Sequence, residues 1–335
     1  MIDFVASKLL QAFFALFGVV SLVFILFTVV PGDPAQMMLD QNEDPEQLAA
    51  IKAKLGFNLP LYQQYFYYLN DLSPLSIHTT QSDAFGAYRA SVYGGWVLFR
   101  GTQKVVVLKF PYLRTSYQKR GKPITEIIKE TLPNTFVLAL SSMLIAVFFG
   151  ILLGIVATLY KDHWMDQTLQ FLSTLGMSVP SFLSALLFSW FFGFVLNKYT
   201  NLNMTGSLYE LDDFGESRRL VLKNLILPAF VLGIRPLAVI IQLIRSNLLE
   251  VLSQDYIRTA RAKGLSTTKI IYKHGLKNAL NPVVTAVSGW FASLLAGAIF
   301  VEFIFGWRGL GKEIVTALNG LDIPVVMLSL IHISE

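Results

Sequence analysis

The residue types that carry acid–base, nucleophilic or metal chemistry are few and scattered in this sequence. The chain has four histidines and no cysteine, so disulfides and thiolate metal sites are excluded. His78, His163 and His274 show neither metal-ligand spacing nor pairing with a nucleophile, and the phosphate-binding pattern G-x-x-x-x-G-K-[ST] does not occur. We therefore expect a chain that is not an enzyme, holds no metal or other cofactor and binds no nucleotide itself.

Two charged residues stand out because they occur in or beside apolar runs. Arg235 lies near the middle of the run 222–244, and a charge buried in a membrane faces the bundle interior or a water-filled path. It is a candidate for the lining of a translocation path, where it would attract a carboxylate; the alternative is an internal ion pair or the filling of a helix break. Glu302 is a candidate contact for a protein docked on the outer face; alternatively it pairs locally with Arg308 or caps a turn.

The segment 245–282 is a basic loop with the pattern of a helical hairpin. It carries seven lysines and arginines against two acids. Ser246 to Lys263 is compatible with a helix, and Gly264 supplies the left-handed residue that ends a helix without strain. Ser266 is a suitable N-cap for a second helix, which we expect from Thr267 to Asn278.

Ala260 and Ala262 give the end of the first helix of this loop short side chains. Such a surface would allow another protein to approach closely. The competing interpretation is a solvated basic hairpin that touches lipid head groups, and charge alone favours it.

The composition indicates a polytopic membrane protein. The chain of 335 residues is 54% hydrophobic and 15% charged, whereas soluble domains carry about 25% charged residues. Several uncharged runs exceed the roughly 18 residues that mark a transmembrane helix. We expect spans at 9–30, 134–159, 169–196, 222–244 and 283–304, with a sixth that starts at 322–327 and is truncated. Gly176 and Pro180 predict a kink or break in the third span.

Orientation follows from the distribution of Lys and Arg. The loop 197–220 has three basic and four acidic residues, so the strongly basic loop 245–282 is the cytoplasmic one. The N-terminus is then cytoplasmic and 31–133 lies outside. That outer region holds eleven basic residues, but loops longer than about 60 residues cross largely regardless of charge. Because the basic residues follow membrane topology, nucleic-acid binding is disfavoured.

The outer region has local order of its own. Asp44 can cap a helix that has Pro45 at its first position and ends at Gly56. A second, aromatic-rich helix is expected at about 61–69, against the membrane face. Residues 75–108 carry turn residues and a β-like run from Val105 to Leu108.

The last eight residues, 328–335, do not continue a transmembrane pattern. They resemble the translation of a transposase adapter used in sequencing-library preparation. We expect this tail to be foreign to the natural protein, so His332 carries no functional argument.

Four segments of the chain resemble one family, the permeases of type I ATP-binding-cassette importers, in their dipeptide/oligopeptide B-type form. The loop 255–282 resembles the family's EAA loop, with Arg258-Thr259-Ala260 in the E-A-A place and Gly264 as its glycine. It departs from the general pattern afterwards, where proline is delayed to Pro282, and this departure resembles the peptide branch. The other three are Pro31-Gly32-Asp33-Pro34-Ala35, Gly176-Met-Ser-Val-Pro-Ser-Phe182 and Glu302-Phe-Ile-Phe-Gly-Trp-Arg-Gly-Leu-Gly311.

The resemblance implies an all-α importer transmembrane domain over 134–327, an N-terminal helix at 1–30 and an outer region of about 100 residues, with 75–108 as an insertion. It implies that the loop 245–282 docks on an ATPase through Asp255, Tyr256, Arg258, Thr259, Ala260, Ala262, Lys263 and Gly264. The implied partners are a second homologous permease, two ATPase subunits that bind the ATP, an extracytoplasmic solute-binding protein and membrane lipid. The implied location is the cytoplasmic (inner) membrane.

The cargo and one other transporter class stay open at this point. Related permeases serve dipeptides, oligopeptides, nickel complexes or other small solutes, and their sequences look alike. A secondary transporter is the alternative from another class. It is disfavoured because such proteins need ionisable relays within the membrane, and Arg235 is the only charged residue deep in a predicted span.

Overall fold

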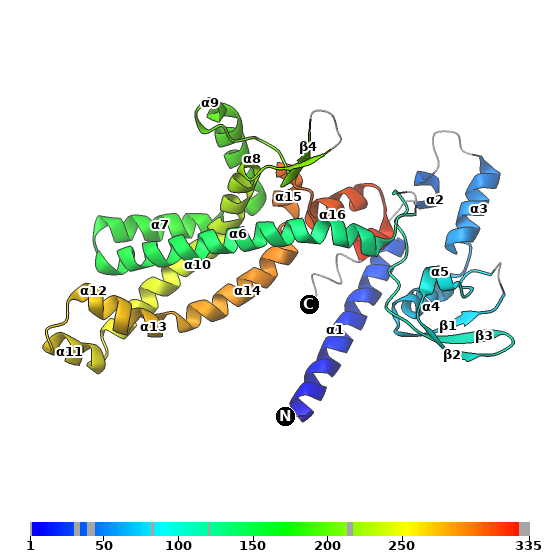
Figure 1. Cartoon of the computed structure of the whole chain (residues 1–335), viewed down its shortest axis with the longest axis horizontal. Helices are drawn as coiled ribbons and strands as arrows, with labels where there is room; N and C mark the ends of the chain where they lie inside the picture. The colour runs from blue at the N-terminus through cyan, green and yellow to red at the C-terminus, as the bar shows by residue number, and fades with distance from the viewer. Residues whose placement is uncertain are drawn as a thin grey trace. The chain divides into compact units, whose positions relative to one another are not determined.

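The computed structural model describes residues 2–29, 34–38, 44–81, 84–119, 121–212 and 217–327. The chain is mainly helical (Figure 1). It divides into two compact units, Met1–Glu130 with Ile314–Glu335, and Thr131–Glu313. The tail 328–335 and Pro31–Asp33 of the first family-like motif lie outside the described residues.

Three helices of the described chain are long and apolar enough to cross a membrane, namely α1 (Ile2–Val29), α6 (Ile124–Leu159) and α10 (Lys223–Leu252). Two bent pairs raise the number to five if each is one span. These elements correspond to the five predicted spans. Residues 323–327 are helical where the predicted sixth span starts.

The third predicted span is two helices rather than one kinked helix. α7 (Trp164–Ser178) and α8 (Ser181–Trp190), which continues into the π-helical turn η1 (Phe191–Val195), meet at 107°. The break falls at Val179 and Pro180, both extended. A proline disfavours the helical region of backbone angles for the residue before it, here Val179. Gly176 lies inside α7, where a Cβ would approach Ile234 to 3.0 Å, so it serves packing.

The fifth predicted span is also bent. α14 (Asn281–Gly297) and α15 (Ile299–Phe305) meet at 54°.

Two helices extend beyond the spans predicted from the apolar runs. α6 begins ten residues before Asn134, within the stretch assigned to the outer region, and carries Pro133 inside. α10 runs eight residues past Ile244. In both places charged side chains end the apolar run, but an α-helix does not need apolar residues once it leaves the hydrocarbon.

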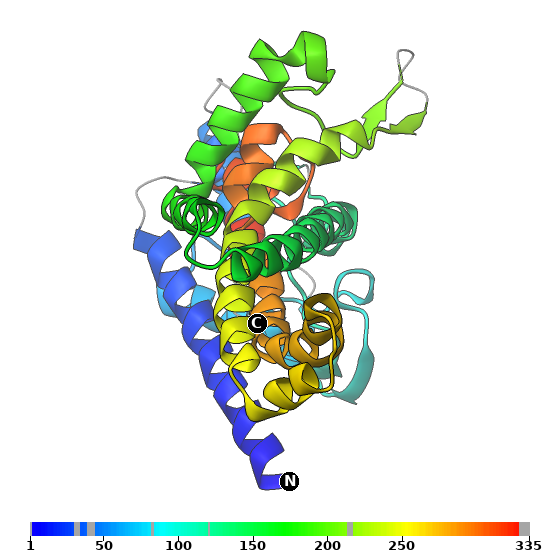
Figure 2. The ribbon, with the colours of Figure 1, turned by 90° about the vertical axis from the view of Figure 1, so that its left-hand side faces the viewer.

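Unit 131–313 is built around the close crossing of α6 and α10. A Cβ on Gly150 would approach Ile240 to 2.7 Å, and one on Gly154 would approach Ile244 to 2.6 Å. Small residues of this kind let two membrane helices pack backbone against side chain. α9 (Asn197–Thr200) and the hairpin of β4 (Tyr209–Leu211) and β5 (Arg218–Leu220) precede α10, and Figure 2 shows the hairpin projecting from the helices.

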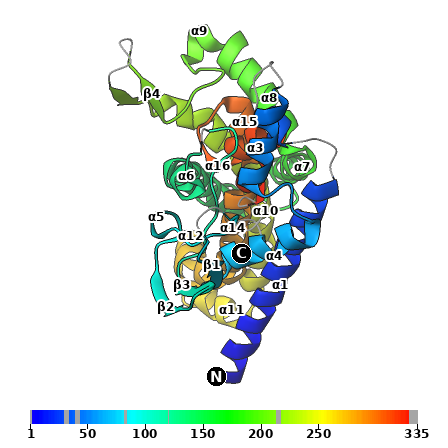
Figure 3. The ribbon, with the colours of Figure 1, turned by 90° about the vertical axis from the view of Figure 1, so that its right-hand side faces the viewer.

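The first unit joins α1 to the short helices that follow it. These are α2 (Pro34–Met37), α3 (Pro45–Leu55) and α4 (Leu61–Leu72). Asp44 caps α3 by accepting from the Glu46 N–H, and Gly56 ends it at φ +77°, as predicted. Val20 and Val23 of α1 pack with Tyr68 of α4, and Figure 3 shows the two helices side by side.

Residues 75–108 form a three-stranded antiparallel sheet. Its strands are β1 (Leu75–Thr79), β2 (Trp96–Arg100) and β3 (Lys104–Leu108), in the order β1-β3-β2, with α5 (Ala90–Tyr93) before β2. Only β3, a run of β-branched residues, was foreseen. β2 shows no alternation of polar and apolar residues, whereas the alternation of β1 (Leu-Ser-Ile-His-Thr) was overlooked.

The end of the described chain returns to this unit. The Asp322 carboxylate accepts hydrogen bonds from the Ser116 hydroxyl and, at 3.0 Å, from the Tyr117 backbone N–H. Val325 and Val326 pack against Ile124 and Ile127.

Candidate functional site

The basic loop contains a short amphipathic helix, α11 (Asp255–Ala262). α10 ends at Leu252, so the predicted continuous helix from Ser246 to Lys263 is wrong, and a turn at Ser253 and Gln254 separates the two. Seven of the eight predicted coupling residues are exposed: Asp255, Tyr256, Arg258, Thr259, Ala262, Lys263 and Gly264.

Ala260 is the exception among the predicted coupling residues. It is 6% exposed and packs with Ile257 against Ile270. The expectation that Ala260 leaves room for a partner is therefore wrong in this structure, because this alanine lets α11 approach its own hairpin.

The turn after α11 has the geometry predicted from its glycine. Gly264 has φ +77°. Its N–H donates to the Arg261 carbonyl at 2.9 Å, and the Leu265 N–H donates to the Ala260 carbonyl at 3.4 Å. This pair of bonds is the Schellman pattern that ends helices.

The second arm of the hairpin begins at the predicted cap. The Ser266 hydroxyl accepts from the Lys269 N–H at 3.4 Å. The arm consists of α12 (Thr267–Ile270), a π-helical turn η2 (Ile271–Gly275) and α13 (Leu276–Ala279). It therefore covers the expected range, but with one wide turn in its middle.

This hairpin is anchored on α10 rather than hanging free. Ile271 and Ala279 pack against Ile244 and Leu248 of α10, and Asn278 donates to the Tyr256 hydroxyl at 2.8 Å, which ties α11 to α13. α10 is 30 residues long, about 45 Å at 1.5 Å per residue. The hairpin is thus anchored at one end of a long, continuous helix.

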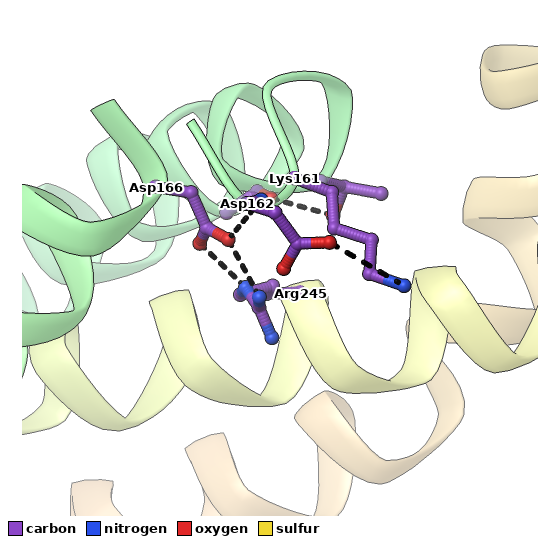
Figure 4. A network of polar contacts seen from close by, with 6 residues as sticks. Lys161, Asp162, Asp166 and Arg245 are labelled. Atoms are coloured by element: carbon purple, nitrogen blue, oxygen red, sulfur yellow. Dashed lines mark hydrogen bonds and ion pairs between the residues drawn. The ribbon is translucent and has the colours of Figure 1, made fainter. Parts of the chain in front are cut away.

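A partly buried ion pair joins α7 to α10 (Figure 4). Arg245 donates from Nε and Nη2 to the two carboxylate oxygens of Asp166, each at 2.6 Å. The Asp162 backbone N–H donates to the same carboxylate at 3.0 Å. Sequence reasoning missed this pair, although each residue is the charged group nearest the end of an apolar run.

Arg235 lies on α10 with an exposed side chain. Its Nη2 donates to the Met177 carbonyl at 3.2 Å, in the last turn of α7 before the break. Carbonyls at a helix C-terminus lack intrahelical partners and favour a cation. The contact fits the predicted alternative, in which Arg235 satisfies a helix break.

Glu302 is completely buried within its unit. Its carboxylate accepts from the Thr135 hydroxyl at 2.7 Å and from the Lys312 N–H at 3.2 Å. It thereby caps the start of α16 (Leu310–Asn319). A protein docked outside could not reach this carboxylate, so the expected outer-face contact is wrong here, and its partners are these groups rather than Arg308.

The glycines of the same motif have a steric reason. A Cβ on Gly309 would meet Glu302 Oε1 at 2.4 Å, and one on Gly311 would meet the Ile299 Cα at 2.6 Å. Trp307 is buried and donates from its indole nitrogen to the Asn134 carbonyl at 3.0 Å. The motif Glu302–Gly311 is therefore a packed corner between α6, α15 and α16.

The described residues contain no group of three or more His, Asp or Glu side chains that could hold a metal ion. His78 is buried in the outer sheet, where its ring nitrogens hydrogen-bond Ser76 and the Gly86 carbonyl. Its role there is structural.

Comparison with known proteins shows the family to which this chain belongs. The family model "Binding-protein-dependent transport system inner membrane component" matches residues 150–334, and the N-terminal model of the same systems matches 1–95. The chain belongs to this family. The permease membership predicted from the four motifs is thus confirmed, and the chain is a multi-pass membrane permease subunit with the importer transmembrane fold.

Relatives of this permease match along nearly its whole length. The dipeptide transport system permease DppB of Alkalihalophilus pseudofirmus is 33% identical over 97% of this chain and 91% of its own. The oligopeptide permease AppB of Bacillus subtilis is 32% identical over 98% and 90%, and the glutathione permease GsiC of Salmonella choleraesuis is 32% identical over 97% and 90%. Among solved structures, the methionine ABC transporter MetNI covers 62% of this chain with a TM-score of 0.46 at 16% identity.

Proposed function

We propose that this permease carries short peptides across the cytoplasmic membrane as one subunit of an ATP-driven importer. The names of its relatives support peptide cargo, since they transport dipeptides, oligopeptides and glutathione. The complete importer holds a second permease, two ATPase subunits that bind the ATP, and an extracytoplasmic binding protein. The N-terminus is cytoplasmic, and this chain itself binds no ATP or cofactor.

The mechanism rests on one observation, that helix α11 has one buried and one exposed side. Its buried face, Ile257 and Ala260, fixes it to the hairpin, and its opposite face presents Arg258 and Thr259 to solvent. Tyr256 is also exposed, but its hydroxyl bonds Asn278 of the hairpin. That exposed face is the one that docks on the ATPase. Because α12–α13 pack on α10, closure of the ATPases moves α10 together with α11.

The Asp166–Arg245 ion pair carries this movement into α7. Two charge-assisted bonds of 2.6 Å resist separation better than neutral contacts do. α7 leads directly to the break at Pro180, where Arg235 of α10 reaches Met177. The path then changes its access at this break, where α10 contacts α7 a second time.

Single-cysteine crosslinking tests the docking face, since the chain has no cysteine of its own. The variant Thr259→Cys, at an exposed position, should crosslink to a cysteine introduced in the co-expressed ATPase subunit. Ala260→Cys, its buried neighbour, is the matched control and should crosslink far less. Equal crosslinking at both positions, or none at Thr259, would show that this face of α11 does not dock.

Uptake by vesicles that contain the complete importer tests the cargo. Labelled dipeptide should accumulate with ATP and binding protein and should not accumulate when either is omitted. Accumulation of nickel or another small solute in place of peptide would assign the permease to a different cargo. Uptake without ATP would instead indicate a secondary transporter.

A further inference from the structure

The sheet of residues 75–108 exposes an apolar face. Directly opposed residues on neighbouring strands point to the same side of a sheet. The register pairs Leu75 and Trp96 with Leu108, and Ile77 and Phe99 with Val106. These six apolar side chains therefore share one face, which we call the outer sheet face.

The other side of the sheet is the one that packs. Ser76, His78, Val105 and Val107 are at most 2% exposed, whereas Trp96 is 76% and Phe99 63% exposed. An antiparallel sheet with one solvated side normally alternates apolar-in and polar-out. Here the buried side includes the polar Ser76 and His78, while the exposed side is apolar. Contiguous exposed apolar patches mark interaction sites, so we expect another surface to cover the outer sheet face.

The charges around this face indicate what the cover is. Lys104 lies on this face at the turn between β2 and β3 and is exposed, whereas Arg100, also exposed, pairs with Val105 and points to the other side of the sheet. Asp83 is the single acidic residue of the sequence between 75 and 108. Apolar and aromatic side chains bordered by cations are typical of surfaces that lie on anionic membranes.

Contacts within the same unit hold the sheet close to a membrane span. The Tyr65 hydroxyl hydrogen-bonds Ser21 of α1 at 2.6 Å, in the last third of the apolar stretch Ala6–Leu26. Five residues further along α4, the Asn70 side chain bonds the Ile77 backbone in both directions, at 2.8 and 3.0 Å. The sheet is thereby tied to α1, through α4, in the last third of the apolar stretch.

We propose that the outer sheet face lies on the membrane surface, with Trp96 and Phe99 in the interfacial layer and Lys104 on anionic phospholipid head groups. The sheet is then a second, peripheral membrane attachment of the outer region. It limits how far α3, α4 and α5 can move from the bilayer.

Lipid-contact quenching in the full-length chain tests this inference. Phe99→Cys and Val97→Cys variants carry an environment-sensitive fluorophore, in nanodiscs of phosphatidylcholine with or without phosphatidylglycerol. Val97 is the matched control because it lies on the same exposed strand but points to the opposite side of the sheet. Lipid-attached spin labels should quench the Phe99 probe about two-fold or more beyond the Val97 probe, and aqueous iodide should do the reverse.

A charge variant distinguishes lipid from a partner protein as the surface that covers the outer sheet face. Lys104→Gln should reduce lipid quenching of the Phe99 probe in phosphatidylglycerol nanodiscs to the level seen without that lipid, and Arg100→Gln, on the other side of the sheet, is the matched control. Iodide quenching of Phe99 equal to that of Val97 would overturn the inference. So would protection of Phe99 that arises only when the partner permease or the binding protein is added, since that protein would then be the cover. Neither outcome depends on peptide being the cargo.

Discussion

Arg245 holds both carboxylate oxygens of Asp166 at 2.6 Å, so that one ion pair fixes α7 against α10. The Asp166 side chain is 3% exposed and the Arg245 side chain 20%. Water therefore has little access to the carboxylate, and loss of either partner leaves a shielded charge without compensation.

We expect Arg245→Gln to lower the free energy of unfolding by about 1–3 kcal/mol, because a shielded carboxylate would lose its charged partner. Thermal unfolding of the purified permease in nanodiscs measures the change. The double variant Asp166→Asn with Arg245→Gln is the control and should recover part of the loss. If the single variant unfolds at the wild-type temperature, the pair does not fix α7.

Gly154→Ala should destabilise the contact between α6 and α10. The new methyl group would lie 2.6 Å from the Ile244 Cβ and 3.1 Å from the Ile241 carbonyl oxygen, and overpacking of this kind costs about 1–3 kcal/mol. Gly18→Ala on α1 is the matched control, since its Cβ would meet nothing within 4 Å. Rescue by Ile244→Ala in the same chain would assign the loss to this contact, and equal stability of the two alanine variants would contradict it.

The outer sheet should loosen in acid through His78. Burial is the main cause that lowers the pKa of His78 below 6.5, and nearby Lys109 adds to it, while the Gly86 carbonyl and Asp71 oppose it. A histidine with a lowered pKa binds fewer protons folded than unfolded, so its stabilisation is fully present above pH 6.5 and is lost as the pH falls from there through the folded pKa.

Hydrogen exchange of residues 75–79 in the full-length chain, corrected for the intrinsic pH dependence, measures this loss. Protection should fall below pH 6.5, the ordinary value for histidine, and should fall less in a His78→Gln variant. Helix α3, in the same unit, serves as the internal reference. A pH dependence unchanged by the substitution would show that His78 is not the group responsible.

The features that could be predicted from the sequence were local ones. The caps at Asp44 and Ser266 and the left-handed turns at Gly56 and Gly264 each depend on a residue and its near neighbours, and the structure has them as predicted. The apolar runs likewise predict helices. They do not predict the full lengths of α6 and α10, because both helices continue into charged residues beyond the apolar runs.

Contacts between distant residues could not be predicted in the same way. Thr135 and Glu302 are 167 positions apart, and Asp166 and Arg245 are 79 apart. Nothing in either neighbourhood indicates that they meet. Glu302 therefore looked like an outer-face residue, and Ala260 looked exposed, because the side of a short helix that faces inward depends on its tertiary packing.

In the proposed mechanism, the turn at Gly264 after α11 transmits ATPase movement to the membrane helices. Gly264 has φ +77° and open space around it, so Gly264→Val strains the turn by about 1–2 kcal/mol without meeting a neighbour. Gly289→Val on α14 is the control, since its Cβ also meets nothing within 4 Å and its backbone is helical.

The measurement is ATP hydrolysis by the reconstituted importer, with and without peptide-loaded binding protein. We expect Gly264→Val to insert and assemble normally but to lose most of the peptide stimulation, while the Gly289 control keeps it. Full stimulation in an assembled Gly264→Val importer would show that this turn does not transmit the movement.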